Sequence, residues 1–74
     1  MPTITRTHFE GATPITERLP HNTLAEAVEA TLAHAREEYR HAHVKRMDNT
    51  SADLWACNNP DWPSFGQGFY LETQ

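Results

Sequence analysis

Residues 23–43 read TLAEAVEATLAHAREEYRHAH, and this stretch carries the local signals of one amphipathic helix. Thr23 precedes Glu26 by three residues, which is the spacing of a capping box. In that motif the hydroxyl accepts a hydrogen bond from an unpaired backbone N–H, and the carboxylate reaches back to another. Pro20 lies just upstream and is unsuited to a helix interior. The sequence therefore predicts a helix that begins after Thr23.

Apolar and small residues recur along this stretch at intervals of three or four, the period of a single helix face. They are Leu24, Val28, Thr31, Leu32, Ala35 and Tyr39. The charged residues Glu26, Glu29, Arg36, Glu37 and Arg40 fall on the other side. A helix with one apolar stripe must pack against another part of the chain, so the remaining segments have to supply its partner.

Those remaining segments have the character of strands, because they are rich in β-branched and aromatic residues and are bounded by turn-forming ones. The expected strands are residues 3–9, 14–19, 43–47, 53–57 and 65–72. The second contains a proline and should lie at a sheet edge. The third and fourth flank a loop of hairpin length. In the last, Gly66 and Gly68 share one face, where a helix or an aromatic ring could approach closely.

The predicted fold is therefore α+β. We expect one amphipathic helix packed on a small antiparallel sheet of three to five strands, in a single domain that covers residues 1–74.

Composition argues against several functional classes. The formal net charge is −4, so the chain lacks the basic footprint of a nucleic-acid-binding protein, and direct nucleic-acid contact is not expected. Cys57 is the single cysteine, which excludes an internal disulfide and fits a reducing cytoplasm. Residues 1–11 show no apolar signal-peptide core, and no apolar run approaches the ~20 residues of a membrane span. The expected location is the cytoplasm, without membrane contact.

Five histidines and Cys57 raise the question of a zinc site. A structural zinc site normally shows paired ligands such as C-x-x-C with H-x-x-x-H, and neither pair is present. His41 and His43 would point apart on a helix and could share an ion only where the chain is extended. We expect them at the helix C-terminus, where cationic groups favour the dipole, and His34 on the solvent face. No metal and no cofactor is expected.

Catalytic groups are equally weakly indicated. Cys57 with a histidine could form a thiol dyad, but a lone cysteine in an aromatic strand is typical of a buried packing residue. Glu37 and Glu38 are adjacent on the helix and diverge by about 100°, so they do not converge as an acid/base pair. We therefore expect that the chain is not an enzyme.

The acidic side of the helix is one candidate binding surface. The helix carries four glutamates against two arginines, and Glu26, Glu29 and Glu37 are the candidate partner-binding residues. Such a face complements a basic surface and steers association. The alternative is a solvated face with local pairs such as Glu37 with Arg40.

The segment between the fourth and fifth expected strands is a second candidate. Asp61 and Trp62 lie between Pro60 and Pro63, which would present an aromatic anchor at low entropic cost. The alternative is that Trp62 folds back to cover a thin core. If neither surface binds, the open face of the sheet around Trp55 remains, together with Arg46 and Tyr70.

The order of elements and three short motifs resemble a known family. The motifs are Thr23-Leu24-Ala25-Glu26-Ala27, Val44-Lys45-Arg46-Met47 and Asp53-Leu54-Trp55-Ala56, and together they extend over about half of the chain. This pattern resembles the small single-domain anti-CRISPR proteins of phages, which block type I surveillance complexes. The resemblance implies action without catalysis, by occupying a DNA-contacting or nuclease-recruiting surface, and a location in the host-cell cytoplasm. An acidic member would suit a lysine-rich DNA channel by standing in for phosphate charge.

The expected function is thus that of a non-catalytic protein inhibitor. It would bind and block a larger protein or nucleoprotein complex that offers a basic surface, with an anti-CRISPR as the specific form. The alternative is a small phage or bacterial regulatory or structural subunit that forms a homodimer through its sheet.

Overall fold

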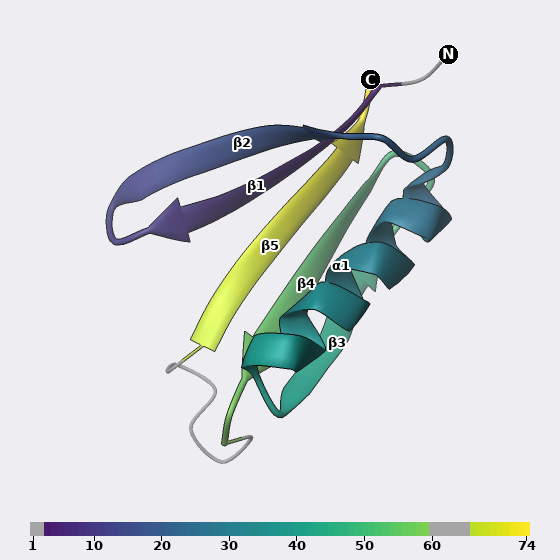
Figure 1. Cartoon of the computed structure of the whole chain (residues 1–74). Helices are drawn as coiled ribbons and strands as arrows, with labels where there is room; N and C mark the ends of the chain where they lie inside the picture. The colour runs from purple at the N-terminus through teal and green to yellow at the C-terminus, as the bar shows by residue number, and fades with distance from the viewer. Residues whose placement is uncertain (1–2, 60–65) are drawn as a thin grey trace.

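The computed structural model describes residues 3–59 and 66–74. The elements follow one another as β1 (Ile4–Glu10), β2 (Thr13–Leu19), α1 (Leu24–Glu38), β3 (His41–Met47), β4 (Ser51–Cys57) and β5 (Gly66–Thr73). The strands form one antiparallel sheet in the order β2-β1-β5-β4-β3, and α1 packs on one face of its β5-β4-β3 half (Figure 1). The predicted α+β fold is confirmed, with five strands.

The helix begins where the capping signal places it. Thr23 has extended backbone angles (φ −130°, ψ 154°), and its hydroxyl accepts the N–H of Glu26 at 3.2 Å. The helix buries one face against the sheet, as its period predicts, through Leu24, Ala27, Val28, Thr31, Leu32 and Ala35. Burial of this stripe, rather than helix propensity alone, holds a helix of this length in place.

The end of the helix differs from the sequence prediction. Helix α1 ends at Glu38, and Tyr39 is already extended (φ −125°, ψ 148°) while its N–H donates to the carbonyl of Ala35 at 2.8 Å. His41 and His43 belong to β3, where they lie opposite Cys57 and Trp55 of β4. The prediction that these histidines lie at the helix C-terminus was wrong, because pairing with β4 overrides the local helix preference of the segment. The strand predicted at residues 43–47 is confirmed and begins two residues earlier.

Strands β1 and β2 form a hairpin that extends beyond the rest of the sheet. Gly11 has φ +65° at the first of the two turn residues, a position where a type II′ turn favours glycine. The hairpin pairs along its whole length, but β1 pairs with β5 only from Ile4 to His8. The tip of the hairpin therefore projects as an arm past β5 (Figure 1). Strand β2 lies at the sheet edge, as its Pro14 predicted.

A small apolar core lies between α1 and the sheet. Its largest fully buried apolar side chains are Ile4, Leu54 and Leu71, one each from β1, β4 and β5. The alanines of β4 that share the face of Leu54 are also buried, which lets the helix approach closely. Arg6 ties the hairpin to this unit, because it donates to the hydroxyl of Thr31 at 3.3 Å and to the carboxylate of Glu17 at 2.8 Å.

Strand β5 is the last strand in sequence but the central one in the sheet. It pairs with β1 on one side and with β4 on the other. Beside it, Thr3 and Gln74 exchange two backbone hydrogen bonds of 3.1 and 2.8 Å, so residues from the two ends of the sequence lie side by side. In the described part of the chain, no helix has the length and apolar character needed to cross a membrane.

Candidate functional site

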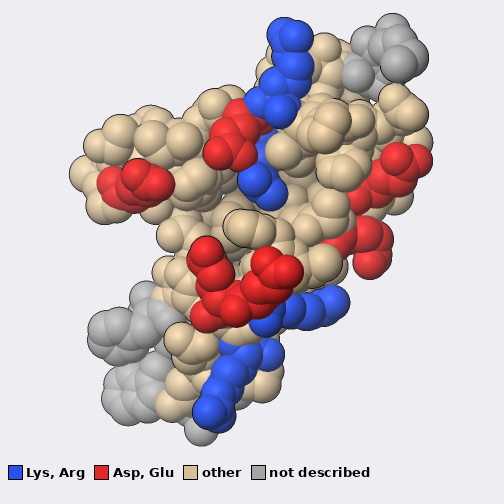
Figure 2. All heavy atoms as spheres, viewed as in Figure 1, with Lys and Arg blue, Asp and Glu red and all other residues tan. Residues whose placement is uncertain are grey.

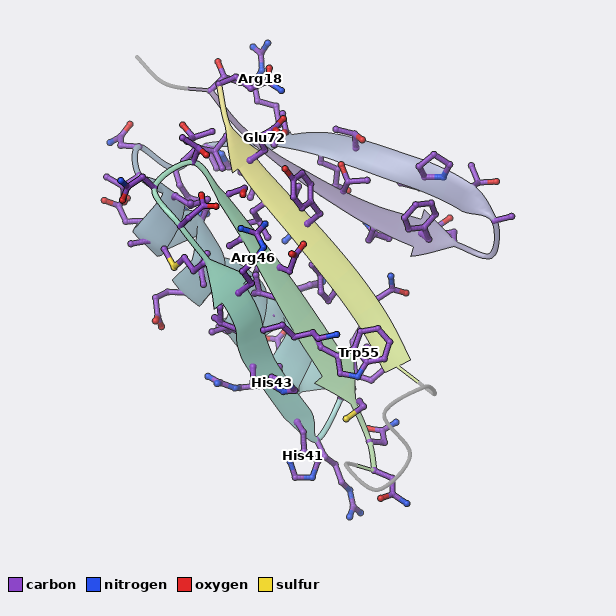
Figure 3. All side chains as sticks on the ribbon, turned by 180° about the vertical axis from the view of Figure 1, so that it is seen from behind. Arg18, His41, His43, Arg46, Trp55 and Glu72 are labelled. Carbon is purple, nitrogen blue, oxygen red and sulfur yellow. The ribbon has the colours of Figure 1, made fainter. Side chains whose placement is uncertain are left out.

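The sheet has a face turned away from α1, called here the open sheet face, and it is hollowed into a groove of about 750 Å³. Side chains from four strands line this groove, including Phe9, Lys45, Arg46, Asp53, Trp55 and Tyr70. Figure 3 views the molecule from this side and shows Arg46 and Trp55 on neighbouring strands. The groove thus combines aromatic and charged groups on a rigid scaffold.

Trp55 lines the groove at a place where β5 opposite it has glycines instead of side chains. Gly68 is its register partner, and a Cβ at that position would meet the indole ring at 3.5 Å. A Cβ at Gly66 would collide with the carbonyl oxygen of Ala56 and would come within 3.0 Å of the same ring. The two glycines leave the space that the ring fills. The prediction that a ring approaches this pair of glycines is confirmed.

Lys45 lies over the indole ring, with its Nζ 5.6 Å from the ring centroid, a cation–π arrangement. The β3–β4 register shifts between Val44 and Arg46, and this bulge directs both Lys45 and Arg46 toward the groove. The indole N–H of Trp55 is buried and has no hydrogen-bond partner among the described residues. The ring therefore packs between Lys45 and the glycines of β5, while its one polar atom stays unpaired among the described residues.

Arg46 is held by three side chains around the β3–β4 turn. Its guanidinium donates to Asp53 at 2.9 Å, to Asp48 at 2.7 Å and to Ser51 at 3.0 Å. The hydrogen bond to Asp53 raises the pKa of Arg46. The backbone N–H groups of Thr50 and Ser51 lower the pKa of Asp48 to about 2. The charge of Arg46 is therefore offset locally, which leaves Lys45 as the more available cation of the groove.

Two further aromatic side chains are exposed at this face. Tyr70 is 38% exposed, and its hydroxyl donates to Glu72 at 3.0 Å, a bond that raises the pKa of Tyr70. Phe9 is 55% exposed on the projecting hairpin. Exposed aromatic rings around a groove are typical of protein-binding surfaces.

The acidic residues predicted to bind a partner lie elsewhere. Glu26, Glu29 and Glu37 are all exposed on α1, on the opposite side of the molecule from the groove. Figure 2, which views the helix side, shows acidic side chains in separate groups along α1 rather than in one patch. Glu37 also lies 3.8 Å from His34. The other predicted pair, Asp61 and Trp62, lies outside the described residues.

Within residues 3–59 and 66–74, no group of three His, Cys, Asp or Glu side chains converges that could hold a metal ion. His41 and His43 occupy alternate positions of β3 and therefore share a face, as Figure 3 shows. Cys57 is 2% exposed, which confirms the prediction of a buried packing residue.

A second, smaller cavity of about 360 Å³ lies between the β1–β2 hairpin and the C-terminal half of α1. His8 lines it, with Nε2 3.6 Å from Glu10 and its ring 6.1 Å from that of Phe69. The ion pair of Arg6 with Glu17 also lines it, and the hydrogen bond from Arg6 lowers the pKa of Glu17. The Nε of Arg6 and the Nδ1 of His8 are buried and have no hydrogen-bond partner among the described residues. The cavity lies where the hairpin meets the helix, and the hydrogen bonds from Arg6 to Thr31 and Glu17 hold the two together.

Comparison with models of protein families, with curated proteins and with solved structures gave no match to this chain. The functional argument therefore rests on the surfaces described above.

Sequence reasoning gave the residues of the open sheet face only as a third choice. One pattern in the sequence does favour the open sheet face. In the alternation of β4, Trp55 faces away from the buried Leu54, and β5 has two glycines on the face that Trp55 shares. A large ring opposite two glycines on a solvent-facing side is a stronger indication of a built surface than the charge count of a helix.

Proposed function

We propose that this chain is a non-catalytic binding protein that blocks a larger protein or nucleoprotein complex, and that the open sheet face makes the main contact. One observation supports this most: the Trp55 ring lies between Gly68 and Lys45 and lines the groove. Trp is the residue most enriched among interface anchors, and an anchor that is already immobile loses little entropy on binding.

The surroundings of Trp55 fit such an interface. Tyr70 and Phe9 add exposed apolar area on the same face, while Lys45 and Asp53 supply polar groups around it. A desolvated aromatic centre with a polar rim is the common anatomy of protein–protein interfaces.

The acidic helix has a different part in this proposal. Glu26, Glu29 and Glu37 face solvent away from the groove, so they contribute long-range attraction toward a basic surface rather than the buried contact. Charge reversal there should slow association, whereas loss of the Trp55 ring should speed dissociation.

The specific form of the proposal is inhibition of a type I CRISPR surveillance complex, which the three sequence motifs support. The test is a gel-shift titration in which a purified type I complex binds labelled target DNA in the presence of the full chain. We expect DNA binding to fall with a midpoint near one inhibitor per complex. Trp55→Ala should raise the dissociation rate of the inhibitor with little salt dependence, by about tenfold or more.

The matched control is the triple variant Glu26→Lys, Glu29→Lys, Glu37→Lys. It should reduce the association rate, and this defect should shrink as salt is added. Unimpaired DNA binding across a panel of type I complexes would reject the anti-CRISPR form. Inhibition that tolerates Trp55→Ala would reject the open sheet face as the contact.

A second candidate, a subunit that dimerises through its sheet, is favoured by β2 and β3, which are the two edge strands of the sheet formed by the described residues. Light scattering over a range of concentrations separates the two. A stable dimer that is abolished by prolines introduced into β2 would support the subunit, and a monomer at all concentrations would reject it.

A further inference from the structure

Strand β3 is an exposed sheet edge. It is the terminal strand of the order β2-β1-β5-β4-β3 and pairs with β4 on its inner side. Six of its seven residues are exposed, and Ala42 alone is buried. Its first part, residues 41–44, pairs with β4 in regular register before the bulge near Lys45. The carbonyl of Ala42 accepts a hydrogen bond from the guanidinium of Arg36 at 3.1 Å, so a strand added there displaces or joins that side chain. Other outward-facing backbone groups on such a strand can pair with a further strand.

The basic residues of the chain are concentrated at this edge. Four of the six Lys and Arg residues lie between Arg36 and Arg46, and β3 itself contains no acidic residue. Because Asp48 and Asp53 offset the charge of Arg46, the exposed Arg40 and Lys45 supply positive charge at either end of residues 41–44. Figure 2 shows basic side chains gathered near the end of α1, where β3 begins. The chain is acidic overall, so this edge is a local exception.

The other edge of the sheet lacks these features. Strand β2 contains Pro14, which cannot donate a backbone hydrogen bond, and it carries charges of both signs in Glu17 and Arg18. Glu17 is already bonded to Arg6 at 2.8 Å. The two edges therefore differ both in charge and in their capacity to pair.

We propose that β3 binds an extended acidic segment of a partner protein, which adds to the sheet as a sixth strand. Side chains of the added strand alternate between the two faces, and directly opposite Cβ atoms lie about 5 Å apart. Acidic residues at every second position would then lie beside His41, His43 and Lys45. This contact shares Lys45 with the Trp55 groove, but it is made by the backbone edge of β3 and does not depend on the function proposed above.

Two other occupants fit less well. A second copy of this chain would set β3 against β3 and bring basic side chains together, and its acidic residues on α1 are helical rather than extended. A nucleic acid would supply negative charge but no backbone N–H and C=O groups for the strand, and the net charge of −4 opposes a long polyanion. An acidic protein strand supplies both the negative charge and the backbone hydrogen-bonding groups that β3 can pair with.

The experiment uses the ¹⁵N-labelled full chain and a capped peptide that alternates Glu and Thr and is long enough to span β3. We expect amide resonances of β3 to shift and their hydrogen exchange to slow, with β2 unaffected. The matched control peptide has the same sequence with alternate backbone nitrogens methylated, so that it keeps the charge but cannot pair. It should bind at least about tenfold more weakly.

Matched variants of the chain test the charge. Lys45→Glu should weaken the Glu–Thr peptide about tenfold, and Arg18→Glu on β2 should leave the affinity unchanged. Spectra of both variants without peptide verify the fold. Equal binding of the methylated peptide would show charge attraction alone and overturn the added strand. Shifts on β2, no binding of the Glu–Thr peptide at millimolar concentration, or tighter binding of a thymidine oligonucleotide would overturn the proposal as well.

Discussion

The indole ring of Trp55 lies against Gly68, its register partner on β5, at a distance of 3.5 Å from where a Cβ would stand. Gly66, two residues earlier on the same face, is closer to its surroundings, because a Cβ there would collide with the carbonyl oxygen of Ala56. One ring and two glycines thus shape this part of the groove, and Gly66 has less space for a side chain than Gly68 has.

Gly66→Ala and Gly68→Ala should differ in stability although the substitution is the same. We expect Gly66→Ala to lower the free energy of unfolding by about 1–3 kcal/mol, because backbone atoms must move. Gly68→Ala places its methyl at ordinary contact distance and should change stability by less than about 1 kcal/mol. Urea denaturation of the two variants measures the difference. Equal stability of the two variants would contradict this account of the groove.

Val28→Asp should abolish cooperative folding. Val28 is 3% exposed in the stripe of α1 that faces the sheet, so the variant would bury an unpaired charge. The cost, about several kcal/mol, approaches the whole stability expected of a domain of this size. The control is Ala33→Asp on the exposed side of the same helix, which should unfold like the parent in a thermal melt followed by circular dichroism. A sharp transition in Val28→Asp would refute the assigned helix face.

Asp48→Asn should destabilise the chain near neutral pH and lose this effect in acid. The folded-state pKa of Asp48 is lowered from 3.8 to about 2 by the N–H groups of Thr50 and Ser51. Its charged form therefore adds stability above about pH 3.8, and that contribution disappears as the pH falls through about 2. Urea denaturation of parent and variant at several pH values gives the difference, with Glu29→Gln as the control. A difference that stays constant down to about pH 2 would contradict the assigned hydrogen bonds.

Cys57 should be protected from thiol reagents in the folded state. Cys57 is 2% exposed, so a chromogenic disulfide reagent can reach its thiol only when the sheet opens. The rate of modification should therefore rise with urea concentration. Cys57→Ala should cost about 1 kcal/mol and leave partner binding intact. A cysteine placed at the exposed Ala33 in that background should react at once. Rapid native-state labelling of Cys57, or loss of binding in a folded Cys57→Ala variant, would revive a role for the thiol.

The start of the helix was predictable and its end was not. Thr23 and the apolar stripe that follows are local signals, and the helix begins where they place it. After Glu38 the residues are compatible with either helix or strand, and the choice depends on pairing with β4, about fifteen residues further along the chain. An edge position for β2 was predictable, because Pro14 restricts it.

The candidate surface was only partly accessible to sequence reasoning. Side-chain alternation indicates that Trp55 faces away from Leu54, and two glycines indicate space for a ring. The bulge at Lys45 has no local signature, since it depends on how β3 and β4 register around Asp53. The cation over the indole ring therefore became visible only in three dimensions. Whether Glu26, Glu29 and Glu37 bind a partner stays a prediction, because their exposure fits a binding face and a solvated face equally.

The central position of β5 has a consequence for synthesis on the ribosome. The β1–β2 and β3–β4 hairpins can form as they emerge. They become one sheet only after residues 66–73 pair with both of them. The pairing of Ile4 with Thr73 closes a loop of nearly the full chain. Contacts so distant in sequence form slowly. A nascent chain arrested before Gly66 would expose the inner edges of both hairpins together with apolar residues of α1. Such a fragment should be a substrate for ribosome-associated chaperones, and the complete sheet should not.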